Sequence, residues 1–163
     1  SIPERRHEMR LIPLIAALAA PGAMSAVAFA QVPPEQTQPA TLSVEMKSPD
    51  FANRVGELFG KAPKPDWLAE ATEAEPVAVT LDGRPYTVLL ACKKHDCANH
   101  QLAILFDAER MYGLRFETRD NSAEERLTWL NIGGGAESID GRTILYAAIT
   151  GSLFNHPAAF SFR

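Results

Sequence analysis

The feature that most constrains this chain is a pair of cysteines, Cys92 and Cys97, the only two in the sequence. An alternating apolar stretch runs directly into Cys92, and a second strand-like stretch begins a few residues after Cys97. A bond between the two sulfurs would close a short loop that joins two neighbouring antiparallel strands and projects from a rigid base. The residues enclosed are all charged or titratable: Lys93, Lys94, His95 and Asp96.

The start of the chain has the pattern of an export signal. Met9 and Arg10 give a short basic start, residues 11–27 are apolar and rich in alanine, and residues 28–30 form a small-x-small cleavage site. We therefore predict that residues 1–30 are an upstream extension and a signal peptide, cleaved after Ala30, and that the protein is periplasmic. In an oxidising compartment, a single pair of cysteines favours a disulfide over a metal site or a redox couple.

Other uses of the loop remain open at this stage. Cys92, His95, Cys97 and His100 are all competent zinc ligands, but zinc sites usually combine ligand pairs from separated segments, so we predict no metal and no cofactor. The disulfide could also be purely structural, holding the connection between two strands without any binding partner. His95 beside Asp96 could instead be the acid and base of an enzyme acting on the cell wall.

The charge balance narrows the class of partner. The whole chain has a formal net charge of −4 at pH 7. A mildly acidic protein does not suit nucleic acid or an anionic membrane surface, and we predict neither as a partner. It does suit a basic partner, because opposite net charges accelerate the encounter.

The hydrophobic periodicity predicts helices at both ends of a sheet. Residues 31–47 are rich in Pro and Gln in their first part and are predicted to be a flexible lead-in. Ser48 can cap a helix that has Pro49 at its first position and ends at Gly60. A last helix is predicted to start with Asp140 as its cap and to run through residue 153.

Between these helices the period changes to two. Residues 77–81 and 86–90 alternate around an Asp-Gly turn, and further strands are predicted at 102–106, 112–116 and 127–132. The sequence thus predicts an α+β fold: a single domain over residues 48–163, with an antiparallel sheet of about five strands, flanking helices and a protruding disulfide-closed loop.

Several separated motifs resemble the inhibitor of vertebrate lysozyme (Ivy) family of bacterial periplasmic proteins. They are Cys-Lys-x-His-Asp-Cys at 92–97, Leu-Thr-Trp-Leu-Asn at 127–131, Ser-Ile-Asp-Gly at 138–141, Ala-Ala-Ile-Thr-Gly-Ser-Leu at 147–153 and Asn-His-Pro at 155–157. One position departs from the pattern: many family members have proline where this chain has Lys94. That change should loosen the loop while adding a positive charge.

The resemblance implies a protein without enzymatic activity that inhibits c-type lysozymes, inserting the 92–97 loop into the lysozyme cleft and so protecting bacterial peptidoglycan. His95 would be the principal contact with the target carboxylates, and Lys93, Lys94 and Asp96 would be further loop contacts. Lytic transglycosylases of the bacterium, which also present an acidic cleft to glycan strands, are the alternative target. The resemblance is compatible with a monomer or a homodimer.

Overall fold

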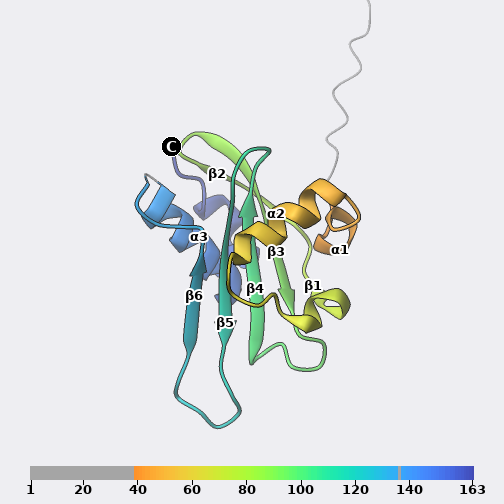
Figure 1. Ribbon diagram of the computed structural model, residues 1–163. Coiled ribbons are helices and arrows are strands. Elements are labelled where there is room, and N and C mark those ends of the chain that lie inside the picture. The colour runs from red at the N-terminus through yellow and green to blue at the C-terminus, as the bar shows by residue number, and fades with distance from the viewer. Residues whose placement is uncertain (1–38, 136) are drawn as a thin grey trace, which may run out of the picture. The chain divides into compact units, whose positions relative to one another are not determined.

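The computed structural model describes residues 39–135 and 137–163, and this part of the chain contains a six-stranded antiparallel sheet with helices packed on both faces (Figure 1). The strands are β1 Thr72–Glu73, β2 Val77–Leu81, β3 Arg84–Cys92, β4 His100–Phe106, β5 Met111–Glu117 and β6 Arg126–Leu130. The helices are α1 Leu42–Glu45, α2 Pro49–Phe59, α3 Glu137–Thr150 and α4 Ser152–Asn155, with short 3₁₀ turns η1 Asp66–Glu70 and η2 Pro157–Ala159. The predicted α+β fold is confirmed.

The sheet is a meander in which each long strand pairs with the next one along the chain. The order is β1-β3-β4-β5-β6, and β2 pairs with β3 on the same side as β1. The two-residue strand β1 was not among the elements predicted from the sequence. Alternate side chains of β3 face opposite layers: Val88 belongs to one apolar cluster and Leu89 to the other. Both faces of the central strands are therefore buried.

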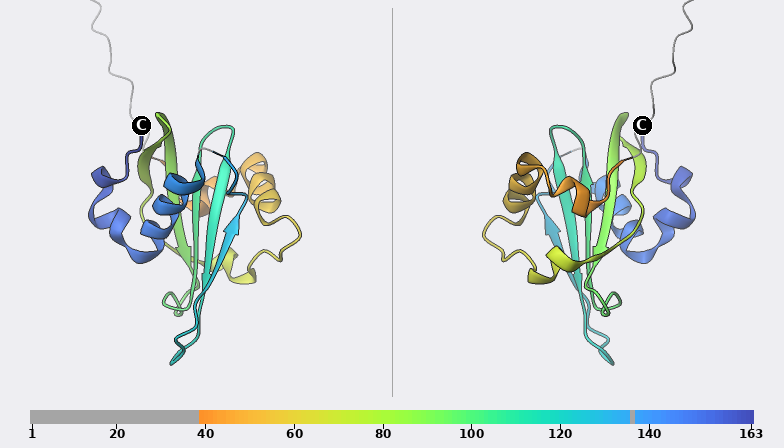
Figure 2. Two further views of the ribbon diagram at one scale, coloured as in Figure 1. Left: turned by 90° about the vertical axis from the view of Figure 1, so that its left-hand side faces the viewer. Right: turned by 90° about the vertical axis from the view of Figure 1, so that its right-hand side faces the viewer.

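The helix α2 covers one face of the sheet, together with α1 and η1 (Figure 2). The side chain of Ser48 accepts a hydrogen bond from the Phe51 amide, so Ser48 caps α2 as predicted. The helix ends at Gly60, which has a φ of 55°. Close packing of α2 on β5 depends on Gly113, because a Cβ there would lie 3.1 Å from the Cδ2 of Leu58.

The helices α3 and α4 cover the other face, and two predictions about them were wrong (Figure 2). Asp140 is not the cap: the chain already turns at Gly135, whose carbonyl accepts from the Ser138 amide, so Asp140 lies inside α3. Gly151 does not lie inside a helix either. It has a φ of 81° and separates α3 from α4, which carries the fully buried Leu153.

The predicted signal peptide and most of the predicted lead-in lie outside the described residues. The helix α1 falls within the segment 31–47 and has no counterpart in the sequence predictions; its Leu42 is buried in the cluster beneath α2. In the part of the chain that the structure describes, no helix is long and apolar enough to cross a membrane.

Candidate functional site

The connection between β3 and β4 projects from one end of the sheet (Figure 1). A disulfide closes this connection. Cys92 is the last residue of β3 and is bonded to Cys97, with the two Cα atoms 4.8 Å apart. The strand pairing continues into the loop, since the Lys93 amide donates to the His100 carbonyl over 3.0 Å. The predicted disulfide is thus confirmed, and the two sulfurs are bonded to each other rather than available as thiolate ligands.

A tight turn forms the tip of the loop. The Asp96 amide donates to the Lys93 carbonyl over 2.9 Å, so Lys94 and His95 are the two central residues. His95 has a φ of 64°, the left-handed conformation that a type II turn requires at its third position. Proline is favoured at the second position of such a turn, which Lys94 occupies here. Lys94 and His95 are also the loop residues that are exposed, whereas the other four are half-buried.

Asp96 points into the base of the loop. Its Oδ1 accepts from the Asn99 Nδ2 over 2.8 Å, its Oδ2 accepts from the Lys93 Nζ over 3.2 Å, and the His100 Nε2 lies 3.5 Å from the same Oδ2. The hydrogen bonds from Asn99 and Lys93 favour the charged form and hold the pKa of Asp96 below its usual value. The neighbours His95 and Asp96 therefore face different surroundings.

A second loop, residues 118–125 between β5 and β6, lies at the same end of the sheet (Figure 1). It contacts the first loop through Asn99, whose Nδ2 donates to the Asp120 Oδ1 over 2.7 Å and whose carbonyl accepts from the Thr118 amide over 2.9 Å. The sequence analysis did not single out Asn99 or Asp120. They are 21 residues apart, and no local pattern signals their contact.

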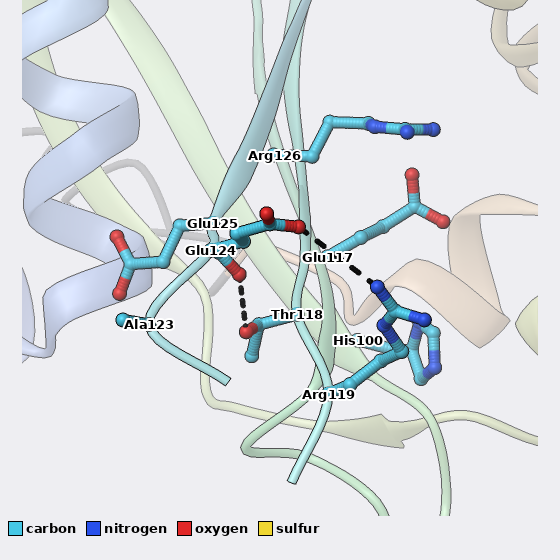
Figure 3. Close-up of a pocket in the computed structure, with 8 residues that line it drawn as sticks. All are labelled: His100, Glu117, Thr118, Arg119, Ala123, Glu124, Glu125 and Arg126. Atoms are coloured by element: carbon cyan, nitrogen blue, oxygen red, sulfur yellow. Dashed lines mark hydrogen bonds and ion pairs between the residues drawn. The ribbon is translucent and has the colours of Figure 1, made fainter. Parts of the chain in front are cut away.

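An open groove lies beside the second loop (Figure 3). Its lining comes from β4, β5, the second loop and β6: His100, Glu117, Thr118, Arg119, Ala123, Glu124, Glu125 and Arg126. The charges are of both signs, and the Arg119 Nη2 lies 3.9 Å from the Glu124 Oε2. Across the loop, the Thr118 Oγ1 donates to the Glu124 carbonyl over 2.7 Å. Such a lining defines a polar surface next to the disulfide loop, without a cluster of metal ligands among the described residues.

Some residues of the motifs near the C-terminus are buried and have a structural role. Residues 138–141 fall in the first turns of α3, where a Cβ on Gly141 would lie 2.9 Å from the Ile132 Cδ1. Ala147 and Ala148 are buried against the sheet. These buried residues support the core, whereas the Asn-His-Pro motif at 155–157 is exposed, as are the two residues at the tip of the 92–97 loop.

The fold and the displayed loop define a class: a small α+β domain that presents a short, disulfide-closed loop on the end of an antiparallel sheet. The model of a protein family described as "Inhibitor of vertebrate lysozyme (Ivy)" matches residues 50–129, which span α2, the sheet up to β6 and the loop. Residues 50–129 of this chain are therefore similar to the Ivy family, and the resemblance found in the sequence is confirmed over that range.

Three named proteins are similar to part of this chain. Two proteins called "Inhibitor of vertebrate lysozyme", from Escherichia coli strain K12 and Escherichia coli O157:H7, are each 41% identical to this chain over 102 residues. The match spans 61% of this chain and 64% of each relative, so it covers less than two thirds of those proteins. A protein of the same name from Pseudomonas aeruginosa is 33% identical over 69 residues, 40% of this chain and 45% of the relative.

Proposed function

We propose that this protein inhibits c-type lysozyme by inserting the 92–97 loop into the active-site cleft, with His95 as the principal contact. The observation that carries the proposal is the geometry of the tip: the turn leaves Lys94 and His95 exposed, while the other four residues of the loop are half-buried. The names of the related proteins supply the class of target.

The chemistry of the tip suits such a cleft. A retaining glycosidase holds a carboxylic acid and a carboxylate about 5 Å apart on either side of the scissile bond. The two ring nitrogens of a histidine between them can form hydrogen bonds with both groups, and charge-assisted bonds of this kind are the strong ones. Lys94 adds a positive charge next to His95. An occupied cleft excludes the sugar, so inhibition requires no chemical step.

The surroundings of Asp96 support an inhibitor over a cell-wall hydrolase. A general acid and base would need His95 and Asp96 to act on one substrate atom. Here both oxygens of the Asp96 carboxylate already accept hydrogen bonds, from Asn99 and Lys93, at the base of the loop. His95 lies at the exposed tip without Asp96 as its partner in the described structure. We therefore assign His95 to binding and propose no catalytic residue.

The proposed compartment is the periplasm. A disulfide between the only two cysteines persists in an oxidising environment, which agrees with the export signal predicted at residues 1–30. A periplasmic inhibitor would meet lysozyme where the enzyme attacks peptidoglycan. The acidic chain, with its net charge of −4, would also speed the encounter with a basic lysozyme.

The test is a titration of the lytic activity of a c-type lysozyme with the purified, oxidised protein. We expect loss of activity at a fixed molar ratio, and at least about tenfold weaker inhibition by His95→Ala, which corresponds to about 1.4 kcal/mol. His156→Ala is the matched control, because His156 is an exposed histidine beside η2 and away from the loop.

Two results would overturn the proposal. No inhibition by the oxidised wild type would remove c-type lysozyme as the target, and a lytic transglycosylase would be titrated next. Equal inhibition by the wild type and His95→Ala would keep the function and remove His95 as the principal contact.

A further inference from the structure

We infer that Asn99 is a positioning residue of the inhibitory loop: it ties the loop to the β5–β6 connection through Asp96 and Asp120, and so fixes the direction in which the tip points. This inference rests on the proposed function, because it concerns the geometry in which the tip meets its target. It assigns no target contact to Asn99 itself.

The hydrogen bonds of Asn99 carry the inference. One Nδ2 atom donates to two carboxylates, the Asp96 Oδ1 over 2.8 Å and the Asp120 Oδ1 over 2.7 Å. An amide NH₂ has two hydrogens and can serve two acceptors at once, a capacity that a carboxylate or a single hydroxyl lacks. The two acceptors also fix the orientation of the amide. Asn99 therefore joins two carboxylates that would otherwise repel each other.

The backbone of Asn99 makes the same connection. Its amide donates to the Asp96 carbonyl over 3.2 Å, and its carbonyl accepts from the Thr118 amide over 2.9 Å. Residues 96–99 thus form a single turn between the loop and β4, which begins at His100. Asn99 is the last residue of that turn, so both its side chain and its main chain link the two loops.

The disulfide alone does not provide this orientation. It joins Cys92 at the end of β3 to Cys97, which sets how far apart the two ends of the loop lie. The exit segment from Cys97 to His100 is instead held by Asn99, since this residue anchors it to Thr118 and Asp120 on the neighbouring connection. Closure and orientation are therefore supplied by different residues.

The sharpest test is Asn99→Asp in the full-length, oxidised chain. The substitution keeps the shape of the side chain but replaces the donor by a third carboxylate between Asp96 and Asp120. We expect the affinity for a c-type lysozyme to fall about tenfold, mainly through slower association, because only a fraction of the molecules would then present the tip correctly. Asn155→Asp, on the exposed surface of α4, is the control for the added negative charge.

Rescue separates positioning from a general loss of structure. Asp120→Asn in the Asn99→Asp protein restores an amide–carboxylate pair with its direction reversed, and we expect it to recover part of the lost association rate. Failure of this rescue, together with a lower melting temperature in both proteins, would mean that Asn99 acts only on overall stability and would overturn the inference.

A readout without any target keeps the inference separate from the proposed function. Hydrogen exchange in the free protein should accelerate at the amides of Asp96 and Thr118 in Asn99→Asp, while the buried amide of Leu89 keeps its rate. Unchanged exchange at Asp96 and Thr118 would overturn the inference whether or not the wild type inhibits lysozyme. Faster exchange with unchanged affinity would also overturn it, because the orientation would then have no consequence for binding.

Discussion

The two loops at the same end of the sheet are ordered in different ways. The 92–97 loop is closed covalently, encloses a half-buried carboxylate and exposes the cationic side chain of Lys94 beside His95. The 118–125 loop has no cysteine. Side-chain bonds to the backbone hold it, such as that from the Thr118 hydroxyl, and it carries three acids and one arginine. Under the proposed function the roles are divided: the 92–97 loop would meet the partner, and the 118–125 loop would hold it in position.

The two loops share one backbone feature. Each contains a turn whose third residue has a positive φ without being glycine: His95 at 64° and Asn121 at 60°. Asparagine adopts this conformation readily, whereas for most other residues it costs roughly 1 kcal/mol. Histidine, like asparagine, is among the non-glycine residue types enriched in this conformation, and only glycine adopts it freely.

Removing the disulfide should produce the largest difference between the two loops. In Cys92→Ser/Cys97→Ser, the free energy of unfolding should fall by about 2 kcal/mol, because the unfolded chain regains the entropy of a short closed loop. Inhibition should weaken more than about tenfold, since the tip would then be ordered only on binding. Urea unfolding and a lysozyme titration measure the two effects.

Hydrogen exchange in the same double variant sharpens the comparison. The Asp96 amide, which closes the turn at the tip, should lose protection, while the Ser122 amide in the turn of the second loop should keep it. Equal loss at both sites would show that the disulfide supports both loops and that the proposed division is wrong.

Glycine at the positive-φ position of each loop should affect stability and inhibition strongly in the 92–97 loop and weakly in the 118–125 loop. His95→Gly should raise the free energy of unfolding by up to about 1 kcal/mol, since glycine adopts the left-handed conformation freely, and should remove inhibition with the imidazole. Asn121→Gly should change both quantities little. The checks are the melting temperature and the lysozyme titration; a destabilised His95→Gly would contradict the interpretation of the turn.

Proline at the second position of the first turn should have a smaller, favourable effect. Lys94→Pro should raise the free energy of unfolding by about 0.5 kcal/mol, because proline restricts the unfolded chain and suits this position of a type II turn. Lys94→Ala is the control for the lost charge. Tighter inhibition by Lys94→Pro than by Lys94→Ala would indicate that rigidity contributes to affinity; a reduced melting temperature in Lys94→Pro would exclude the type II geometry.

The smallest effect is expected from mild acidification. The pKa of Asp96 is lowered in the folded protein below its usual 3.8, so its stabilising contribution is present above that value and is lost as the pH falls through the lowered pKa. Exchange protection of the loop amides should therefore persist from about pH 7 to about pH 5 once intrinsic exchange rates are corrected. Loss of protection in this window, compared with Asp96→Asn, would contradict the role of the carboxylate.

Local sequence patterns predicted the elements that depend on interactions between residues close together in the sequence. The helix beginning at Pro49 was recognisable from its cap and its apolar spacing, and the hairpin of β2 and β3 from alternation around Asp82 and Gly83. The exposed loop followed from the two cysteines between strands. The resemblance to a family added His95 as the principal contact, which stays a prediction.

The features that the sequence did not reveal depend on contacts between distant segments. The link from Asn99 to Asp120 forms only when two loops meet at the end of the sheet, and Leu42 becomes buried only when the sheet and α2 are in place. Gly151 was predicted inside a helix because its apolar neighbours keep a helical spacing. Gly151 instead has a positive φ, which ends α3 and allows Leu153 to be buried in the core, and this depends on tertiary packing.

The continuous pairing of β3 and β4 into the loop also has a mechanical consequence. Six residue pairs join these strands, from Thr87 with Phe106 to Cys92 with Gln101, and Lys93 adds one more bond beyond them. If the tip enters a cleft as proposed, the force on it would be transmitted along two strands that are paired side by side inside the sheet. The load would reach the packed interior directly, and this continuity would resist bending at the base of the loop.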